Sequence, residues 1–166
     1  KKQHLKLTVL LEKKLRENLK KAFWDRFTAD LLEEPPIYTQ IPDLFKDIKK
    51  LYLSIISCVN NADKRTKYKN DFNGILDIEY VELLTNNGRM DESIILNICL
   101  NMLEQIKVIG IPKNDSKIKK MMSKISKMED NNTNSGVDIC SIFKLIIKLL
   151  EELQRFFMNK MINDVE

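Results

Sequence analysis

Few side chains in this sequence have the types and spacing that metal or nucleophilic chemistry requires. His4 is the only histidine in the chain, and it lies near its beginning. A zinc site needs about four ligands, and neither a cysteine nor a second histidine stands at ligand spacing from His4. A Cys–His nucleophile would have to join this histidine to a cysteine on an apolar helix face. We therefore expect neither a metal site nor a reactive cysteine.

The cysteines, Cys58, Cys99 and Cys140, are far apart, odd in number and set among aliphatic residues at helical spacing. This pattern is typical of reduced thiols in a hydrophobic core and does not predict a disulfide framework. Their usage favours a cytoplasmic or nuclear compartment.

Phosphate binding and acid–base catalysis have little support in the sequence. The glycines of Asn73-Gly74 and Asn87-Gly88 are isolated, so neither begins a phosphate-binding loop followed by Lys and Ser or Thr. Adjacent acids occur at Glu33-Glu34, Asp91-Glu92 and Glu151-Glu152, but such pairs are usually solvated or complement a helix dipole. We predict no enzyme activity and no bound cofactor.

Basic residues gather in three clusters, although the net charge is only +4. The clusters are Lys13, Lys14, Arg16, Lys20 and Lys21; Lys64, Arg65, Lys67 and Lys69; and Lys113, Lys117, Lys119, Lys120, Lys124 and Lys127. Nucleic-acid grooves interleave aromatic residues with basic ones, and only Tyr68 lies near a cluster, so we do not expect a nucleic-acid partner. Solvated helix faces are the favoured interpretation, and an anionic partner or membrane surface is the alternative.

Hydrophobic periodicity predicts the helices that must position these residues. The expected ranges are 5–32, 42–59, 70–86, a helix from Asp91 to Gly110, a short one that opens at Asp115 or Ser116, and 137–162. Residues 60–69 are expected to form a polar, basic connection, and 129–136 a flexible polar loop. Asn87-Gly88 should end a helix in the left-handed conformation, and Asp91 should cap the next.

The first predicted helix carries apolar residues at three- and four-residue intervals, and we expect them to be buried: Leu11, Leu15, Leu19, Ala22, Phe23, Phe27 and Leu31. Phe23, Trp24 and Phe27 are interpreted as core residues rather than as a calmodulin-target helix, because Asp25 and Asp30 interrupt the basic surface. The last helix is apolar around much of its circumference, which favours a place near the centre of a bundle.

These features predict an all-α fold: a single-domain bundle of about six amphipathic helices with a mostly buried C-terminal helix, occupying residues 1–166. Charged residues interrupt the richest apolar stretch, 139–157, so it is a poor candidate to span a bilayer. Because the chain opens inside a predicted helix, we expect it to be a fragment of a longer protein. The abundance of Lys, Asn and Ile indicates an AT-rich genome, such as that of a protist.

Four short segments resemble one known family. They are Phe-Trp-Asp at 23–25, Leu-Glu-Glu-Pro-Pro at 32–36, Asn-Gly-Arg-Met-Asp at 87–91 and Ile-Pro-Lys-Asn-Asp at 111–115. In order and spacing they are similar to the T-complex protein 11 family, which shows an asparagine-glycine turn, an aspartate, a helix and a Pro-x-Arg-Asp element. Asn114 departs from this pattern, because the family usually has arginine there. We therefore do not assign to Asn114 any ion pair or anion contact that the family's arginine makes.

The resemblance implies a helical, non-enzymatic regulatory protein that binds protein partners. It links the family in animals to sperm function and flagella, and in fungi to the cyclic-AMP-dependent protein kinase pathway. A cytoplasmic, flagellum-associated location follows from the same resemblance.

Partner contact is expected in one of two places. The first is a groove between packed helices that accepts an amphipathic partner helix, and the second is the pair of loops around Pro35, Pro36, Pro112 and Asp115. For Pro112 and Asp115, a helix stop and an N-cap are the favoured interpretation over direct partner contact. For the anionic alternative, the candidate residues are Lys117, Lys120 and Lys124.

Overall fold

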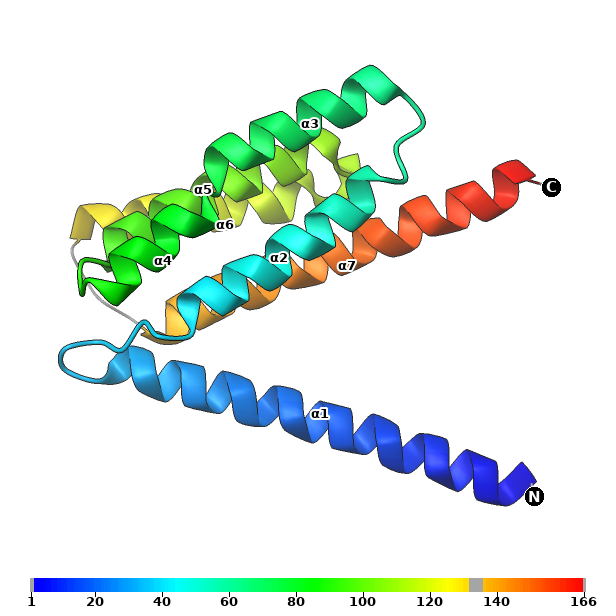
Figure 1. Cartoon of the computed structure of the whole chain (residues 1–166), viewed down its shortest axis with the longest axis horizontal. Helices are drawn as coiled ribbons and strands as arrows, with labels where there is room; N and C mark the ends of the chain where they lie inside the picture. Colours follow the sequence, from blue (N-terminus) through cyan, green and yellow to red (C-terminus); the bar gives the residue numbers. More distant parts are fainter. Residues whose placement is uncertain (1, 132–135, 166) are drawn as a thin grey trace.

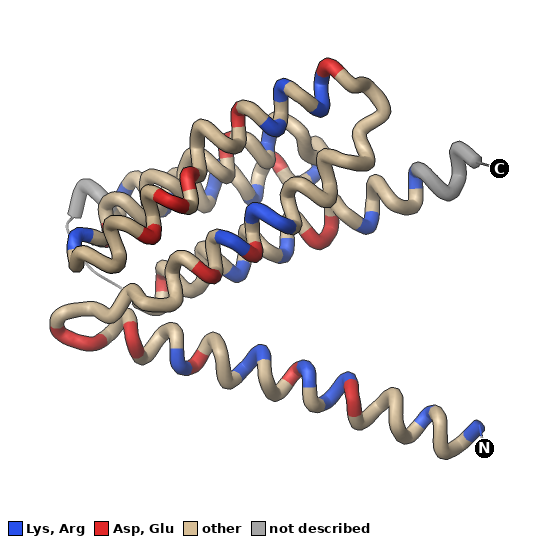
Figure 2. Tube along the Cα trace, viewed as in Figure 1, with Lys and Arg blue, Asp and Glu red and all other residues tan. Residues whose placement is uncertain are grey.

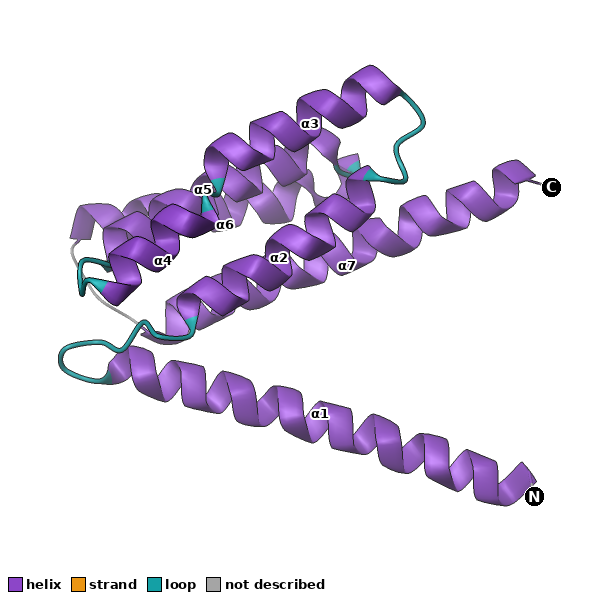
Figure 3. Ribbon diagram, in the orientation of Figure 1, coloured by secondary structure: helices purple, strands orange, loops and turns teal. Residues whose placement is uncertain are grey.

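The computed structural model describes residues 2–131 and 136–165 as helices joined by short connections (Figure 3). The helices are α1 (Lys2–Leu32), α2 (Ile41–Ile56), α3 (Ala62–Ile75), α4 (Ile78–Asn86), α5 (Glu92–Ile109), the short 3-10 helix η1 (Pro112–Asn114), α6 (Asp115–Asn131) and α7 (Gly136–Val165). No strand occurs in these residues, so the predicted all-α class is confirmed.

Two helices organise the packing. α2 lies along α7 and also contacts α3 and α4, while α5 packs against α3, α6 and α7. α1 packs against α7 near its carboxyl end and then diverges, so that its amino-terminal end stands apart from the other helices (Figure 1). The bundle core therefore lies among α2, α5 and α7, and α1 joins it only at one end.

The predicted central position of the last helix is confirmed for its first half. α7 buries one nearly continuous set of apolar residues: Ile139, Cys140, Ile142, Phe143, Ile146, Leu149, Leu150 and Leu153. The Phe143 ring lies at the junction of three helices, with centroids 5.8 Å from Phe27 of α1 and 5.3 Å from Phe45 of α2. Within the described residues, no helix is both long and apolar enough to cross a bilayer.

The prediction of one helix at 70–86 after a polar connection is wrong. α3 already begins at Ala62, because the Asn61 side chain caps it by accepting a hydrogen bond from the Lys64 N–H at 3.1 Å. The chain then breaks at Leu76, which is extended, and Asp77 caps α4 by accepting from the Tyr80 N–H at 3.2 Å. The basic cluster at 64–69 consequently lies on a helix and not on a loop.

Other predicted helix ends are confirmed. Gly88 has φ of +67°, the left-handed conformation expected after α4. Asp91 caps α5 by accepting from the Ile94 N–H at 2.9 Å, and α5 ends before Gly110. The flexible loop was predicted at 129–136, but 129–131 complete α6 and Gly136 begins α7. Residues 132–135 lie outside the described residues.

The expected burial of the first helix is wrong for most of its length. Phe27 and Leu31 are 1% and 2% exposed, whereas Leu15 and Leu19 are 59% and 61% exposed. The apolar residues recur every four positions, and each such step advances about 40° around a helix with 3.6 residues per turn. Leu11 and Leu31 therefore point about 160° apart, and a neighbour that covers one cannot cover the other.

Candidate protein-docking surfaces

The groups that could do chemistry are dispersed. Within the described residues, no three His, Cys, Asp or Glu side chains lie close enough to hold a metal ion. His4 lies on the diverging part of α1. Cys99 and Cys140 are buried and Cys58 is half-buried, all three as free thiols. Burial raises the pKa of the Cys99 thiol, which disfavours the nucleophilic thiolate.

The three acidic pairs lie in different parts of the fold. Glu33 and Glu34 are exposed in the α1–α2 connection, which appears as a red segment in Figure 2. Asp91 caps α5, and the pKa of Glu92 is raised by partial burial and by the nearby Asp138 carboxylate. Glu152 of α7 accepts a hydrogen bond from Asn114 Nδ2 at 3.4 Å. Asp91 and Glu152 thus accept hydrogen bonds within the fold, whereas Glu33 and Glu34 are exposed to solvent.

Asn114 stands where the resemblance places the family's arginine. The side chain is 4% exposed and directs its amide at a carboxylate of α7. The neutral amide keeps a hydrogen bond between η1 and α7 without an ion pair.

A polar cluster that the sequence did not predict joins three helices. The Tyr52 hydroxyl of α2 donates to the Tyr68 carbonyl of α3 at 3.3 Å and accepts from Gln105 Nε2 of α5 at 3.1 Å. Its ring stacks on Phe72, with centroids 3.9 Å apart. Burial raises the pKa of Tyr52 to about 12. The cluster lies inside the core, because Tyr52 and Phe72 are fully buried and Gln105 is 8% exposed.

The diverging part of α1 exposes large apolar side chains that no described element covers. Seven of them are between 56% and 65% exposed: Leu5, Leu7, Val9, Leu10, Leu11, Leu15 and Leu19. Six lysines, Lys2, Lys6, Lys13, Lys14, Lys20 and Lys21, fall within an arc of about 120° that lies opposite Leu11, Leu15 and Leu19, whereas Leu10 lies among the lysines. Leu11, Leu15 and Leu19 therefore form an exposed apolar stripe on α1, opposite its lysines.

This apolar stripe continues into a cleft where α1 leaves the bundle, which we call the wedge. The wedge has a volume of about 480 Å³ and is walled by Leu19, Phe23 and Trp24 of α1, Leu44, Ile48 and Leu51 of α2, and Ile147 of α7. Lys20, Asp47 and Glu151 complete its lining. An apolar cleft with a few charged groups has the composition of a site for an amphipathic helix.

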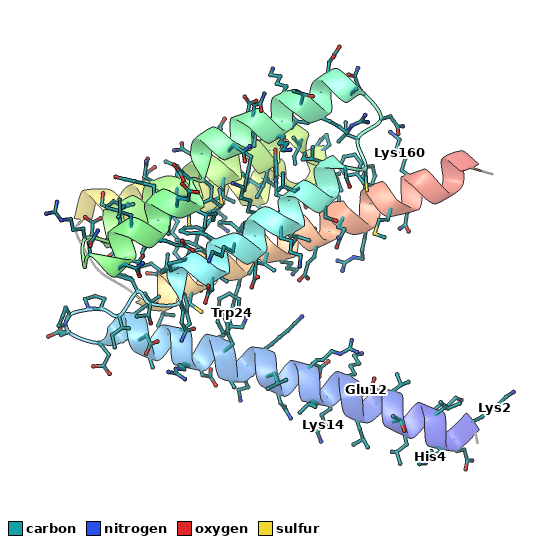
Figure 4. The ribbon with its side chains drawn as sticks, viewed as in Figure 1. Lys2, His4, Glu12, Lys14, Trp24 and Lys160 are labelled. Carbon is teal, nitrogen blue, oxygen red and sulfur yellow. The ribbon has the colours of Figure 1, made fainter. Side chains whose placement is uncertain are left out.

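Aromatic packing fixes the closed end of the wedge. Trp24 projects from α1 towards α2 and α7, as Figure 4 shows, and its ring meets those of Phe23 and Phe27 at centroid distances of 5.1 Å and 6.0 Å. The Lys144 ammonium of α7 lies 5.5 Å from the Trp24 ring centroid. The prediction that these aromatics belong to the core is confirmed for Phe27, while Phe23 is 38% exposed.

A second hollow lies beside α6. It has a volume of about 510 Å³, an apolar floor of Met121 and Leu145, and a rim of Lys117, Lys120, Lys124 and Lys127. Lys124 Nζ lies 3.1 Å from Asp138 Oδ1. We call this site the lysine hollow.

The predicted partner-binding residues fall in two separate regions. Lys117, Lys120 and Lys124 come together on the rim of the lysine hollow, shortly after Pro112 and Asp115, which begin η1 and α6. Pro35 and Pro36 lie apart from these residues, in the connection between α1 and α2. Of the residues that line the wedge, Leu19 and Phe23 of α1 were expected to be buried. Periodicity identified them as apolar but carried no signal that α1 leaves the bundle.

Comparison with known proteins gives one consistent result. The sequence model of the family T-complex protein 11 matches residues 2–165. Mouse T-complex protein 11 is 25% identical over 93 residues, which are 56% of this chain and 16% of the mouse protein. Human T-complex protein 11-like X-linked protein 1 is 26% identical over 111 residues, which are 67% of this chain and 20% of the human protein. The matched segment thus spans a fifth or less of these relatives, and no solved structure matches the chain significantly.

Proposed function

This chain belongs to the T-complex protein 11 family, and we propose that it is a non-enzymatic scaffold domain that docks an amphipathic helix of a protein partner in the wedge. The single observation that carries the proposal is the exposed stripe of Leu11, Leu15 and Leu19 on α1, whose last member lines the wedge between α1, α2 and α7. Family membership, which the sequence resemblance anticipated, agrees with a regulatory role.

The energetics of α1 support a partner at this place. Full burial of a leucine side chain stabilises a complex by about 1.5–3 kcal/mol, and five leucines of α1 between Leu5 and Leu15 are at least half exposed. Helices in proteins depend mainly on the packing of their apolar face rather than on intrinsic propensity. A partner helix in the wedge would supply that packing to the part of α1 that the bundle leaves uncovered.

The charges of the wedge restrict how a partner helix lies in it. Lys20 stands on the α1 wall, whereas Asp47 and Glu151 stand on the walls formed by α2 and α7. A helix with an apolar stripe, carboxylates along the edge next to α1 and basic residues along the other edge complements both walls. Such a helix would contact apolar residues on three elements at once.

The resemblance to the family directs the choice of partner. It implies a link to the cyclic-AMP-dependent protein kinase pathway and to sperm or flagellar function, in the cytoplasm. We therefore assign the docked helix to a component of that kinase pathway.

The test is a binding titration of this chain with purified subunits of the cyclic-AMP-dependent kinase from the same organism. Leu15→Gln combined with Leu19→Gln should weaken binding by about tenfold or more, because two apolar contacts are lost. Lys6→Gln combined with Lys13→Gln is the matched control on the opposite side of α1 and should change affinity little. Equal affinity for the leucine variant and the unaltered chain would refute docking on α1. Absence of binding by every subunit would refute the kinase assignment.

A further inference from the structure

We propose that the lysine hollow beside α6 binds a second kind of ligand, an acidic amphipathic helix of a protein partner. The hollow shares no lining residue with the wedge, so this inference does not depend on the proposed function. Its basis is the combination of a straight lysine row, an apolar floor and the recessed position of that floor.

The lysine row follows one face of α6. Lys117, Lys120, Lys124 and Lys127 are spaced by three, four and three residues, close to the helical repeat of 3.6, so they point in one direction. The row extends about 15 Å along the helix axis. Lys119 lies on the same helix but points about 100° away from Lys120 and does not line the hollow.

The charges of the row favour an anionic ligand. Like charges three or four residues apart destabilise a helix, and all four ammonium groups lie on neighbouring turns. Lys124 is paired with Asp138, whereas Lys117, Lys120 and Lys127 form no ion pair with a described side chain. Carboxylates on a partner helix, repeated at three- and four-residue intervals, would meet these three lysines in register and relieve the repulsion.

The floor of the hollow indicates a helix rather than a membrane or a nucleic acid. Met121 and Leu145 are half-buried beneath exposed lysines, so they cannot reach the acyl region of a bilayer in the way that a protruding apolar face does. No aromatic side chain is among the described residues that line the hollow, so it offers nothing on which bases stack. An apolar stripe flanked by carboxylates fits both floor and rim, and Met121 can adapt its unbranched side chain to it.

The experiment is a fluorescence-anisotropy titration of the full chain with a designed helical peptide that carries a leucine stripe flanked by glutamates at the spacing of the row. We expect binding that weakens with added salt. Lys120→Glu should weaken it about fivefold, the scale expected when one exposed charge pair becomes repulsive. Lys119→Glu, the same change on the neighbouring residue, should leave the affinity within about twofold because it lies off the face. Circular dichroism of both variants checks that each remains folded.

Two altered peptides and one membrane arm complete the test. The peptide with glutamine in place of glutamate and the peptide with serine in place of leucine should both bind more weakly. Equal effects of Lys119→Glu and Lys120→Glu would overturn the proposal, and so would undiminished binding of the serine peptide, because either result means that only overall charge matters. Failure of the acidic peptide to bind would also overturn it. Binding of the chain to phosphatidylserine vesicles in a Lys120-dependent manner without peptide binding would assign the row to an anionic membrane instead.

Discussion

Individual polar side chains hold the bundle together at places where three helices meet. The Tyr52 hydroxyl satisfies the Gln105 amide and the Tyr68 carbonyl at once, and its ring stacks on Phe72. Because Tyr52 is fully buried, removal of its hydroxyl would leave the Gln105 amide without this partner, and no water molecule could replace it. Tyr52 therefore links α2, α3 and α5 through one side chain.

Tyr52→Phe should lower the free energy of unfolding by about 1–2 kcal/mol, because it leaves the buried Gln105 amide without its acceptor and removes the second hydrogen bond of the Tyr68 carbonyl but retains the ring. Urea denaturation of the two proteins measures the difference. Tyr80→Phe is the matched control, since Tyr80 is 52% exposed and its change should alter stability little. An equal effect of both substitutions would show that the cluster contributes nothing specific.

The same residue predicts a dependence of stability on alkaline pH. Burial raises the pKa of Tyr52 from 10.0 to about 12. Between these values the folded chain keeps the phenol proton while the unfolded chain releases it, so this contribution is complete below pH 10 and is lost as pH rises towards 12. Urea denaturation from pH 9 to pH 12 should show a decline in stability that is less steep for Tyr52→Phe. An identical decline in both proteins would contradict the assignment.

Sequence reasoning worked best for residues whose partners are close along the chain. Asp91 and Gly88 act as predicted, because a cap and a left-handed turn are decided by the next few backbone groups. The Tyr52–Gln105 bond joins residues 53 positions apart, and no local pattern encodes such a pair. The sequence shows that Asn114 departs from the family pattern, but its contact with Glu152 can be seen only in the folded structure.

Among the elements, α1 and α7 meet at an unusually close approach. A Cβ atom placed on Gly136 would lie 2.8 Å from the Cβ of Leu31 and 3.3 Å from its carbonyl carbon. Only glycine at the first position of α7 lets the carboxyl end of α1 pack this closely. A larger residue at this position would push the carboxyl end of α1 away from α7.

Gly136→Ala should destabilise the chain by about 1–3 kcal/mol, because the added methyl group forces α1 away from α7. Gly74→Ala is the matched control within α3, where an added Cβ meets nothing within 4 Å, and it should stabilise the chain by about 0.5–1 kcal/mol. Thermal unfolding monitored by circular dichroism measures both. A stabilising effect of Gly136→Ala would mean that the approach of α1 to α7 is not restrictive.

The two halves of α1 should respond differently to truncation of an apolar side chain. Leu31→Ala should cost about 2–5 kcal/mol because Leu31 is 2% exposed, whereas Leu19→Ala should leave stability almost unchanged because Leu19 is 61% exposed. Urea denaturation of the two variants provides the comparison. A large loss for Leu19→Ala would indicate that the free chain already covers this face and would contradict an open wedge.

The helices themselves were predicted more reliably than their breaks. The apolar pattern from Phe72 to Leu84 continues across Leu76 and Asp77, so periodicity alone joined two elements. The structure separates them because Asp77 caps a new helix and Leu76 enters the core in an extended conformation. Tertiary packing thus places the break between α3 and α4, although the helical period of apolar residues continues across it.

At the scale of the molecule, the all-α class followed from composition and periodicity, but the openness of the fold did not. An apolar stripe has the same pattern whether it faces its own core or another protein, so the sequence placed the leucines of α1 inside. The structure places α7 against one end of α1 only, so Leu11 and Leu15 remain exposed and Leu19 faces α7 only across the wedge. The wedge forms because the carboxyl end of α1 packs against the bundle while the rest of α1 diverges from it.

The most direct test of this account is site-specific photo-crosslinking in the cell of origin. A photoreactive amino acid at position 15 replaces Leu15 on the apolar side of α1, and a second variant carries it at position 13, in place of Lys13, about 160° around the helix. We predict one discrete adduct at position 15, joined to a partner peptide with apolar residues at three- and four-residue spacing, and none at position 13. Equal adducts at both positions, no adduct at either, or an adduct confined to the chain itself would contradict docking of a partner helix on α1.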